Sequence, residues 1–110
     1  MFLYLTTIGR ISGQPREIEI WFTQHGRRFY VIAERGERAN WVRNLQAQPH
    51  VKVRVGARQF KATARVVHDD REPKLTGAVK ALSYAKYGWS DGLVVELAPG
   101  VGARLRPKGQ

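Results

Sequence analysis

Cysteine is absent from this 110-residue chain, and acidic side chains are scarce, with 9 Asp and Glu against 19 Lys and Arg. The lack of cysteine excludes disulfide bridges, zinc–thiolate sites and thiol nucleophiles, so any redox chemistry must come from a bound cofactor. No apolar run approaches the roughly 20 residues of a membrane-spanning helix. The formal net charge of +10 attracts anions in general, without choosing among nucleic acid, lipid head groups and small anionic molecules.

Length and the first residues set the broad class. A chain of 110 residues is expected to form one domain that can bury its own core. We predict that residues 1–98 form this domain and that residues 99–110, rich in glycine, proline and basic side chains, form a flexible tail. Phe2–Leu5 is too short for the core of a signal peptide and lacks a basic leader, so we expect a cytoplasmic protein.

Alternation of apolar and polar residues predicts about six short strands, at 2–6, 16–23, 29–33, 51–55, 60–66 and 92–97. The run 29–33 is almost wholly apolar, which indicates burial on both faces. Gly56 and Ala57 fit a two-residue turn, so residues 51–66 should form a β-hairpin.

Two helices are expected among these strands. The first covers residues 39–48 and is stopped by Pro49. The second is capped within His68–Asp70, has Pro73 in its first turn and ends at Gly88. Its expected buried stripe consists of Leu75, Ala78, Val79, Leu82 and Ala85. We therefore predict a mainly β fold, an antiparallel β-barrel whose open sides are closed by two helices.

The stretch between the first two expected strands, Leu5–Arg16, combines two arginines, two glycines and three hydroxyl side chains with no carboxylate. Guanidinium groups pair bidentately with phosphate or carboxylate oxygens, hydroxyls donate hydrogen bonds, and glycines let backbone N–H groups approach a ligand closely. The loop predicts an anion site, and a cofactor phosphate is the working hypothesis. A solvated turn that needs its glycines only for geometry is the alternative.

Aromatic residues gather at the end of the second expected helix, where Tyr84, Tyr87 and Trp89 follow one another closely. A planar ring would stack well on them, although the same side chains could simply close one end of the barrel. Trp21 and Trp41 are expected in the core. None of the three histidines stands at metal-ligand spacing from another, so no metal site is predicted.

The expected hairpin has one apolar face and one basic face. The basic face is formed by Lys52, Arg54, Lys61 and Arg65, with Arg58 as a further basic residue of the hairpin. Such a face could follow a phosphate backbone, but no aromatic side chains interleave with it to stack bases. A basic module that binds nucleic acid or another polyanion is therefore the weaker alternative.

Leu5–Arg16 reads L-T-T-x-G-R-x-S-G-x-x-R, and it is followed by Val31–Ala33 and by the W-x-x-N-L block Trp41–Leu45. Together these blocks resemble the deazaflavin (F420)-dependent nitroreductase and quinone reductase family. The first motif is quite specific when the second block follows it. The resemblance covers roughly residues 3–98 and implies the flavin-binding split β-barrel fold, in agreement with the barrel inferred from the strand count.

The resemblance implies binding of reduced coenzyme F420 and hydride transfer to an electron-poor acceptor such as a quinone or a nitro compound. It implies contacts with the coenzyme's phosphate and glutamate tail from Thr7, Arg10, Ser12, Gly13 and Arg16. It places the ring near Ile18, Ile20, Ala33, Glu34, Arg35 and Gly36, and the substrate near Tyr84, Tyr87 and Trp89. Because the cofactor carries the chemistry, no catalytic acid or base is predicted.

Three features depart from the family. The tyrosine-rich substrate helix of the family is represented only by Tyr84 and Tyr87, with Trp89 beyond. Glu34–Glu37 puts bulk and negative charge where relatives often have small residues, and the chain starts at the first expected strand, without the N-terminal segment that helps cover the ligand in longer relatives. FMN as the cofactor, or a barrel without a tightly bound cofactor that acts through a partner, therefore stays open. We also expect a homodimer, because split barrels often pair through sheet faces.

Overall fold

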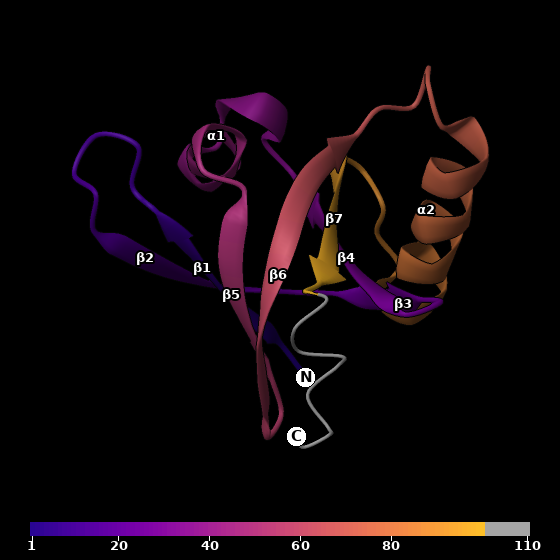
Figure 1. Ribbon diagram of the computed structural model, residues 1–110. Coiled ribbons are helices and arrows are strands. Elements are labelled where there is room, and N and C mark those ends of the chain that lie inside the picture. Colours follow the sequence, from indigo (N-terminus) through magenta and orange to yellow (C-terminus); the bar gives the residue numbers. More distant parts are fainter. Residues whose placement is uncertain (101–110) are drawn as a thin grey trace.

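In a computed structural model, which describes residues 1–100, one curled antiparallel sheet of seven strands carries two α-helices (Figure 1). The strands are β1 (Leu3–Ile8), β2 (Pro15–Ile20), β3 (Thr23–His25), β4 (Arg28–Ala33), β5 (His50–Val55), β6 (Arg58–Val67) and β7 (Leu93–Pro99). The helices are α1 (Asn40–Ala47), preceded by the 3-10 turn η1 (Gly36–Arg38), and α2 (Pro73–Tyr87). The predicted mainly β class with two helices is confirmed.

The order of strands across the sheet is β2-β1-β5-β6-β7-β4-β3, so β2 and β3 stand at opposite edges. A single strand over residues 16–23 is therefore wrong: the chain leaves β2 after Ile20, and Trp21 and Phe22 carry it to β3. Because β2 pairs with β1 while β3 pairs with β4, so short a link forces the sheet to curl until its edges approach each other. The strand count is accordingly seven rather than about six.

The main core fills the inside of the curl. Inward residues of β1, β4, β5 and β7 are buried there, and Val42 and Leu45 of α1 cover one end. A second cluster lies on the outer face of β4 and β7 under α2 and contains Tyr30, Ile32, Val67, Val79 and Val94. Burial of β4 on both faces, predicted from its apolar run, is thus confirmed.

Helix α2 departs from its expected packing. Its buried residues are Thr76, Val79 and Ser83. The predicted apolar stripe is confirmed at Val79 and at the half-buried Leu75 and Ala78, but it is wrong at Leu82, which is 39% exposed, and at the exposed Ala85. Polar residues can be buried here because their hydroxyls donate to backbone carbonyls, Thr76 to Glu72 at 3.1 Å and Ser83 to Trp89 at 2.7 Å.

The ends of α2 were predicted with mixed success. The N-cap is Glu72 rather than a residue of His68–Asp70, because the His68 carbonyl accepts the Arg71 and Glu72 N–H groups in a preceding turn. Gly88 ends the helix in the left-handed region as expected, with φ of 71°. Within residues 1–100 no helix is long and apolar enough to cross a membrane. Strand β7 reaches Pro99, and the rest of the predicted tail from residue 101 lies outside the described residues.

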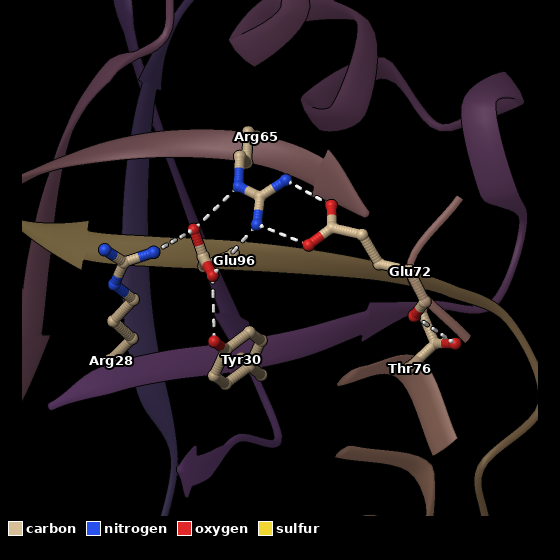
Figure 2. A network of polar contacts seen from close by, with 6 residues as sticks. All are labelled: Arg28, Tyr30, Arg65, Glu72, Thr76 and Glu96. Atoms are coloured by element: carbon tan, nitrogen blue, oxygen red, sulfur yellow. Dashed lines mark hydrogen bonds and ion pairs between the residues drawn. The ribbon is translucent and has the colours of Figure 1, made fainter. Parts of the chain in front are cut away.

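A buried carboxylate, Glu96 of β7, joins three strands (Figure 2). It accepts hydrogen bonds from Tyr30 at 2.8 Å, Arg65 at 2.8 Å and Arg28 at 3.0 Å. Arg65 extends the network to the start of α2 through Glu72, at 2.6 and 3.1 Å. Burial favours a higher pKa for Glu96, but its three donors outweigh this and hold the pKa below the ordinary value. Burial and the bond to Glu96 raise the pKa of Tyr30 to about 12.

Replacing Glu96 with Gln should lower the free energy of unfolding at pH 7 by about 2 kcal/mol, since Arg28 loses its carboxylate partner and Arg65 keeps only Glu72. Because the folded pKa of Glu96 is depressed, its contribution is complete above the unfolded value of 4.5 and is lost as pH falls through the folded value. Urea denaturation at several pH values should show the difference shrinking in acid. Glu17→Gln is the control, because the exposed Glu17–Arg54 pair at 3.5 Å should contribute under about 1 kcal/mol. An undiminished difference at about pH 3 would contradict the assignment.

Two glycines provide a matched test of backbone geometry. Gly92 has φ of 143°, and an added Cβ would lie 2.8 Å from Ile32 Cγ2 and against the Ala33 carbonyl oxygen. Gly92→Ala should therefore destabilise the fold by about 2–4 kcal/mol. Gly77→Ala in α2 meets no atom within 4 Å and should stabilise it by about 0.5–1 kcal/mol. Thermal denaturation measures both effects. Equal changes in the stability of the two variants would contradict the prediction.

Candidate functional site

A cavity of about 550 Å³ lies where the β2–β3 link, the end of β4 and the end of α2 meet. Its volume falls in the usual range for sites that bind small organic molecules. Seven aromatic residues line it: Phe2, Trp21, Phe22, Tyr30, Trp41, Tyr87 and Trp89. A cavity of this size with aromatic walls suits a planar ring system.

Hydrogen bonds from α2 hold the β2–β3 link in place. The Tyr87 hydroxyl donates to the Phe22 carbonyl at 2.8 Å and accepts from the Phe22 N–H at 3.2 Å. The Lys86 ammonium also donates to the Phe22 carbonyl, at 3.0 Å, and lies over the Phe22 ring. Phe22 lies between β2 and β3 and has no strand partner there. The side chains of Tyr87 and Lys86 bind its backbone instead and so fix the position of this cavity wall.

Trp21 is not the core residue that was expected. It is 43% exposed, and its ring stacks on Tyr87 with centroids 4.4 Å apart and planes 1° from parallel. Trp89 meets it edge-on, with a centroid distance of 6.4 Å. The three rings form an aromatic platform at the cavity, and the exposed part of Trp21 is open to a further ring. Trp41, by contrast, is half-buried and packs against the main core.

Thr23 carries an unusual polar atom in the same wall. The residue is 6% exposed, and Oγ1 is the one buried side-chain oxygen or nitrogen of residues 1–100 without a hydrogen-bond partner. Its cross-strand neighbour Tyr30 forms no hydrogen bond with it and donates its own hydroxyl to Glu96. An unsatisfied buried hydroxyl costs about 1–3 kcal/mol. A ligand in the cavity that Thr23 lines would offer such a partner.

Three charged residues line the cavity: Glu19, Glu34 and Arg35. The Glu19 carboxylate accepts a hydrogen bond from the Tyr4 hydroxyl at 2.6 Å, and this bond raises the pKa of Tyr4. Within residues 1–100, no ion pair involves any of the three. The lining therefore bears two carboxylates and one guanidinium, none of them neutralised by a protein partner in that part of the chain.

The loop between β1 and β2, residues 9–14, has a geometry of its own. The Gly9 N–H donates to the Gln14 carbonyl and the Gly13 N–H to the Gly9 carbonyl, both at 2.8 Å. Ser12 Oγ accepts from the Gln14 N–H at 3.1 Å. A Cβ on Gly9 would lie 2.6 Å from Ser12 Oγ, and Gly13 has φ of 72°, so both positions require glycine. The loop is a preformed turn beside α1 (Figure 1).

Asn44 of α1 joins this loop to the helix. Its Oδ1 accepts from the Arg10 N–H at 3.1 Å and from Arg10 Nη1 at 2.8 Å. Its Nδ2 donates to the buried Thr7 hydroxyl at 3.4 Å, and Arg10 also reaches Asn40 at 3.3 Å. The two most distinctive sequence blocks, one containing Arg10 and the other Asn44, are therefore in direct contact.

The structure places the expected site residues in two groups at opposite ends of β2. Arg10, Ser12, Gly13 and Arg16 are exposed around the loop, with Thr7 buried beneath it, while Ile20, Ala33, Glu34, Arg35, Tyr87 and Trp89 line the cavity. Three others lie outside the lining: Ile18 is half-buried in β2, Gly36 begins η1, and Tyr84 is 64% exposed.

Sequence reasoning missed Glu19, Trp21, Thr23 and Trp41 as cavity residues. One signal was present. Trp21 shares the polar side of the alternation with Glu17 and Glu19, and a large aromatic residue on a solvent-facing side is unusual enough to suggest a binding role.

The sequence model of the family described as F420H(2)-dependent quinone reductase matches residues 1–92. An F420H(2)-dependent quinone reductase of Mycobacterium tuberculosis strain H37Rv is 30% identical over 90 residues, which cover 77% of this chain and 60% of that protein. The matched region thus spans 60% of the length of this curated relative.

Solved structures agree on the fold. An F420-H2 dependent reductase (FDR-A) superposes with a TM-score of 0.63 at 26% identity, covering 87% of this chain and 92% of that one. A haem storage protein from Vibrio cholerae reaches 0.71 at 22% identity, covering 90% and 81%, and shares the fold alone. The curled sheet is the split β-barrel that the sequence motifs implied. With 92 of its residues matched by the family model and its two signature blocks in contact, the chain belongs to the F420H(2)-dependent quinone reductase family.

Proposed function

We propose that this protein is a cytoplasmic reductase that binds reduced coenzyme F420 and passes hydride from it to an electron-poor acceptor such as a quinone or nitro compound. One observation carries the proposal: strand β2 begins at the preformed basic loop and ends at the aromatic cavity. Its six residues span roughly 20 Å at about 3.3 Å per residue. A ligand with a planar ring at one end and an anionic tail at the other matches this arrangement.

The ring end of the site fits a deazaflavin. Trp21, Tyr87 and Trp89 offer stacking surfaces, and the unpartnered Thr23 hydroxyl lies in the same wall. When bound, the coenzyme supplies the hydride, so the protein needs no catalytic acid or base of its own. The aromatic walls orient the ring and exclude water from the reacting carbon.

At the tail end, the two arginines have different roles. The Arg10 guanidinium donates hydrogen bonds to Asn44 and Asn40, so it mainly holds the loop against α1. Arg16 is exposed and pairs with no carboxylate within residues 1–100, which leaves its guanidinium to meet a phosphate or carboxylate of the ligand. Ser12 and Gly13 complete the loop, whose tight turn keeps these groups in place before any ligand binds.

A polyanion-binding role on the hairpin face gains little support. Of the four basic residues expected there, Arg65 is bound to Glu96 and Glu72, and Arg54 pairs with Glu17 at 3.5 Å while stacking on Tyr4 at 4.0 Å. Lys52 and Lys61 alone line the shallow hollow of about 330 Å³ on this face without an ion pair within residues 1–100.

Binding of the coenzyme can be measured by fluorescence titration. The wild-type protein should bind coenzyme F420 with micromolar or tighter affinity, and Arg16→Ala should weaken binding about tenfold, because a charge-assisted contact is lost. Arg27→Ala is the matched control, since it removes the same charge from the exposed β3–β4 turn. Arg10→Ala should also weaken binding, with a loss of thermal stability that Arg16→Ala does not show.

Parallel titrations with FMN separate the two cofactors that the fold could hold. Tighter binding of FMN than of coenzyme F420 would move the assignment to flavin. Flat titrations with both would overturn the proposal, whereas equal effects of Arg16→Ala and Arg27→Ala would remove only the role given to Arg16.

We further propose that the protein is a homodimer. A solved structure described as a domain-swapped dimer superposes on this chain with a TM-score of 0.62 at 24% identity, covering 87% of this chain and 78% of that one. Phe2 and Trp21, 40% and 43% exposed beside the cavity, are apolar surface that a second chain would cover. Light scattering should give about 25 kDa, twice the chain mass of 12.5 kDa. A mass of one chain at every concentration would contradict the dimer.

A further inference from the structure

We propose that the cavity selects planar aromatic acceptors that carry a positive charge, and that Glu19 and Glu34 determine this selection. The inference rests on the proposed reductase function, since it names the class of acceptor taken by the same cavity. It begins from an asymmetry of charge: the chain has 19 basic and 9 acidic residues, yet within residues 1–100 the charged groups that line the cavity are two carboxylates and one guanidinium.

Five of the nine acidic side chains form no ion pair within residues 1–100, and the two cavity carboxylates are among them. Glu17, Asp69, Glu72 and Glu96 each form an ion pair with a lysine or arginine. Glu19 and Glu34 form none within residues 1–100, and Glu34 accepts no side-chain hydrogen bond there either. Glu19 extends from β2 and Glu34 follows β4, so the negative charge comes from two different segments of the wall.

The aromatic lining strengthens the same preference. Cations are attracted to the faces of tryptophan and tyrosine rings, and most strongly to tryptophan. Trp21 is 43% exposed, stacks on Tyr87 and meets Trp89 edge-on. Trp41 also lines the cavity. A planar cation would therefore gain stacking and charge attraction together, whereas a planar anion would gain the stacking alone.

Arg35 is the group that opposes this preference. It lines the cavity with one positive charge against the two carboxylates, and the basic chain around it also repels cations at long range. Salt screens the distant charges over about 8–10 Å, so the groups in contact with the ligand decide the sign. Two carboxylates and three tryptophans against one guanidinium favour the cation.

Hydride transfer to such an acceptor balances simply. The reduced coenzyme gives a hydride, which forms a C–H bond at a ring carbon of the cation, and the acceptor becomes a neutral dihydro compound. The coenzyme loses two electrons and releases one proton to solvent. Since the product has lost its charge, the carboxylates hold it less firmly than the substrate, which assists product release. The carboxylates attract the substrate cation more strongly than the partly neutralised transition state, so their loss should raise KM and leave kcat unchanged or somewhat higher.

Quenching of tryptophan fluorescence tests the selection without any coenzyme. The probes are N-methylacridinium and anthracene-9-carboxylate, which have three fused rings and opposite charges. We expect the wild-type protein to bind the cation at least about tenfold more tightly than the anion at about 0.15 M salt, where the distant basic charges are screened, and this ratio should fall when the salt is removed. Glu34→Gln should reduce the ratio severalfold, and Glu19→Gln with Glu34→Gln should bring it close to one. Glu17→Gln, on β2 but outside the cavity lining, should leave it unchanged.

Each outcome has a distinct meaning. Equal binding of the two probes by the wild-type protein, or a preference that survives the double substitution, would overturn the inference. The Glu34 side chain makes no hydrogen bond within residues 1–100, so Glu34→Gln is expected to fold. If the double variant does not fold, this single variant still tests the inference. Failure of coenzyme binding would overturn the proposed reductase but not the charge selection, since these titrations contain no coenzyme. Where the coenzyme does bind, Glu34→Gln should raise KM for a cationic acceptor without lowering kcat.

Discussion

The rest of the structure depends on a link of two residues between strands at opposite edges of the sheet. Trp21 and Phe22 connect β2 to β3, which are separated in the sheet by five other strands. An extended dipeptide spans only about 7 Å, so the sheet must curl until those edges nearly meet. The curl creates the interior that the main core fills, and the cavity lies at the place where the edges approach. Tyr87 and Lys86 fix the link by hydrogen bonds to the Phe22 backbone, which gives α2 a role in shaping the site as well as in covering the sheet.

Some of this was predictable from local patterns. The hairpin of β5 and β6, the burial of β4 and the end of α2 at Gly88 each follow from a few neighbouring residues. The break between β2 and β3 does not, because the alternation of apolar and polar residues continues through Trp21 and Phe22. The break is revealed only by strand pairing, since β2 pairs with β1 and β3 pairs with β4. That pairing depends on the whole sheet and not on neighbouring residues.

The site shows the same division between local and distant information. The loop 9–14 could be predicted as an anion site because its glycines, arginines and hydroxyls are adjacent in sequence. Its attachment to Asn44 could not, since that contact spans 34 positions of the chain. The buried face of α2 was predicted only in part. Thr76 and Ser83 are buried because their hydroxyls donate to nearby backbone carbonyls, and the spacing of apolar residues gives no sign of this. Thr23 was missed for a related reason, because nothing in its neighbours indicates that its hydroxyl is buried without a partner.

The charges along β2 bear on how a ligand would lie in the site. The strand begins beside the exposed Arg16 and the basic loop and ends beside Glu19, with Glu34 across the cavity. A ligand with an anionic tail placed the other way round would bring its negative charges against these two carboxylates and leave Arg16 facing an uncharged ring. Like charges at contact distance cost about 1 kcal/mol even in water and more where solvent is excluded. If a ligand of this shape binds as proposed, the opposite polarity of the two ends would fix its direction, independently of which ring system occupies the cavity.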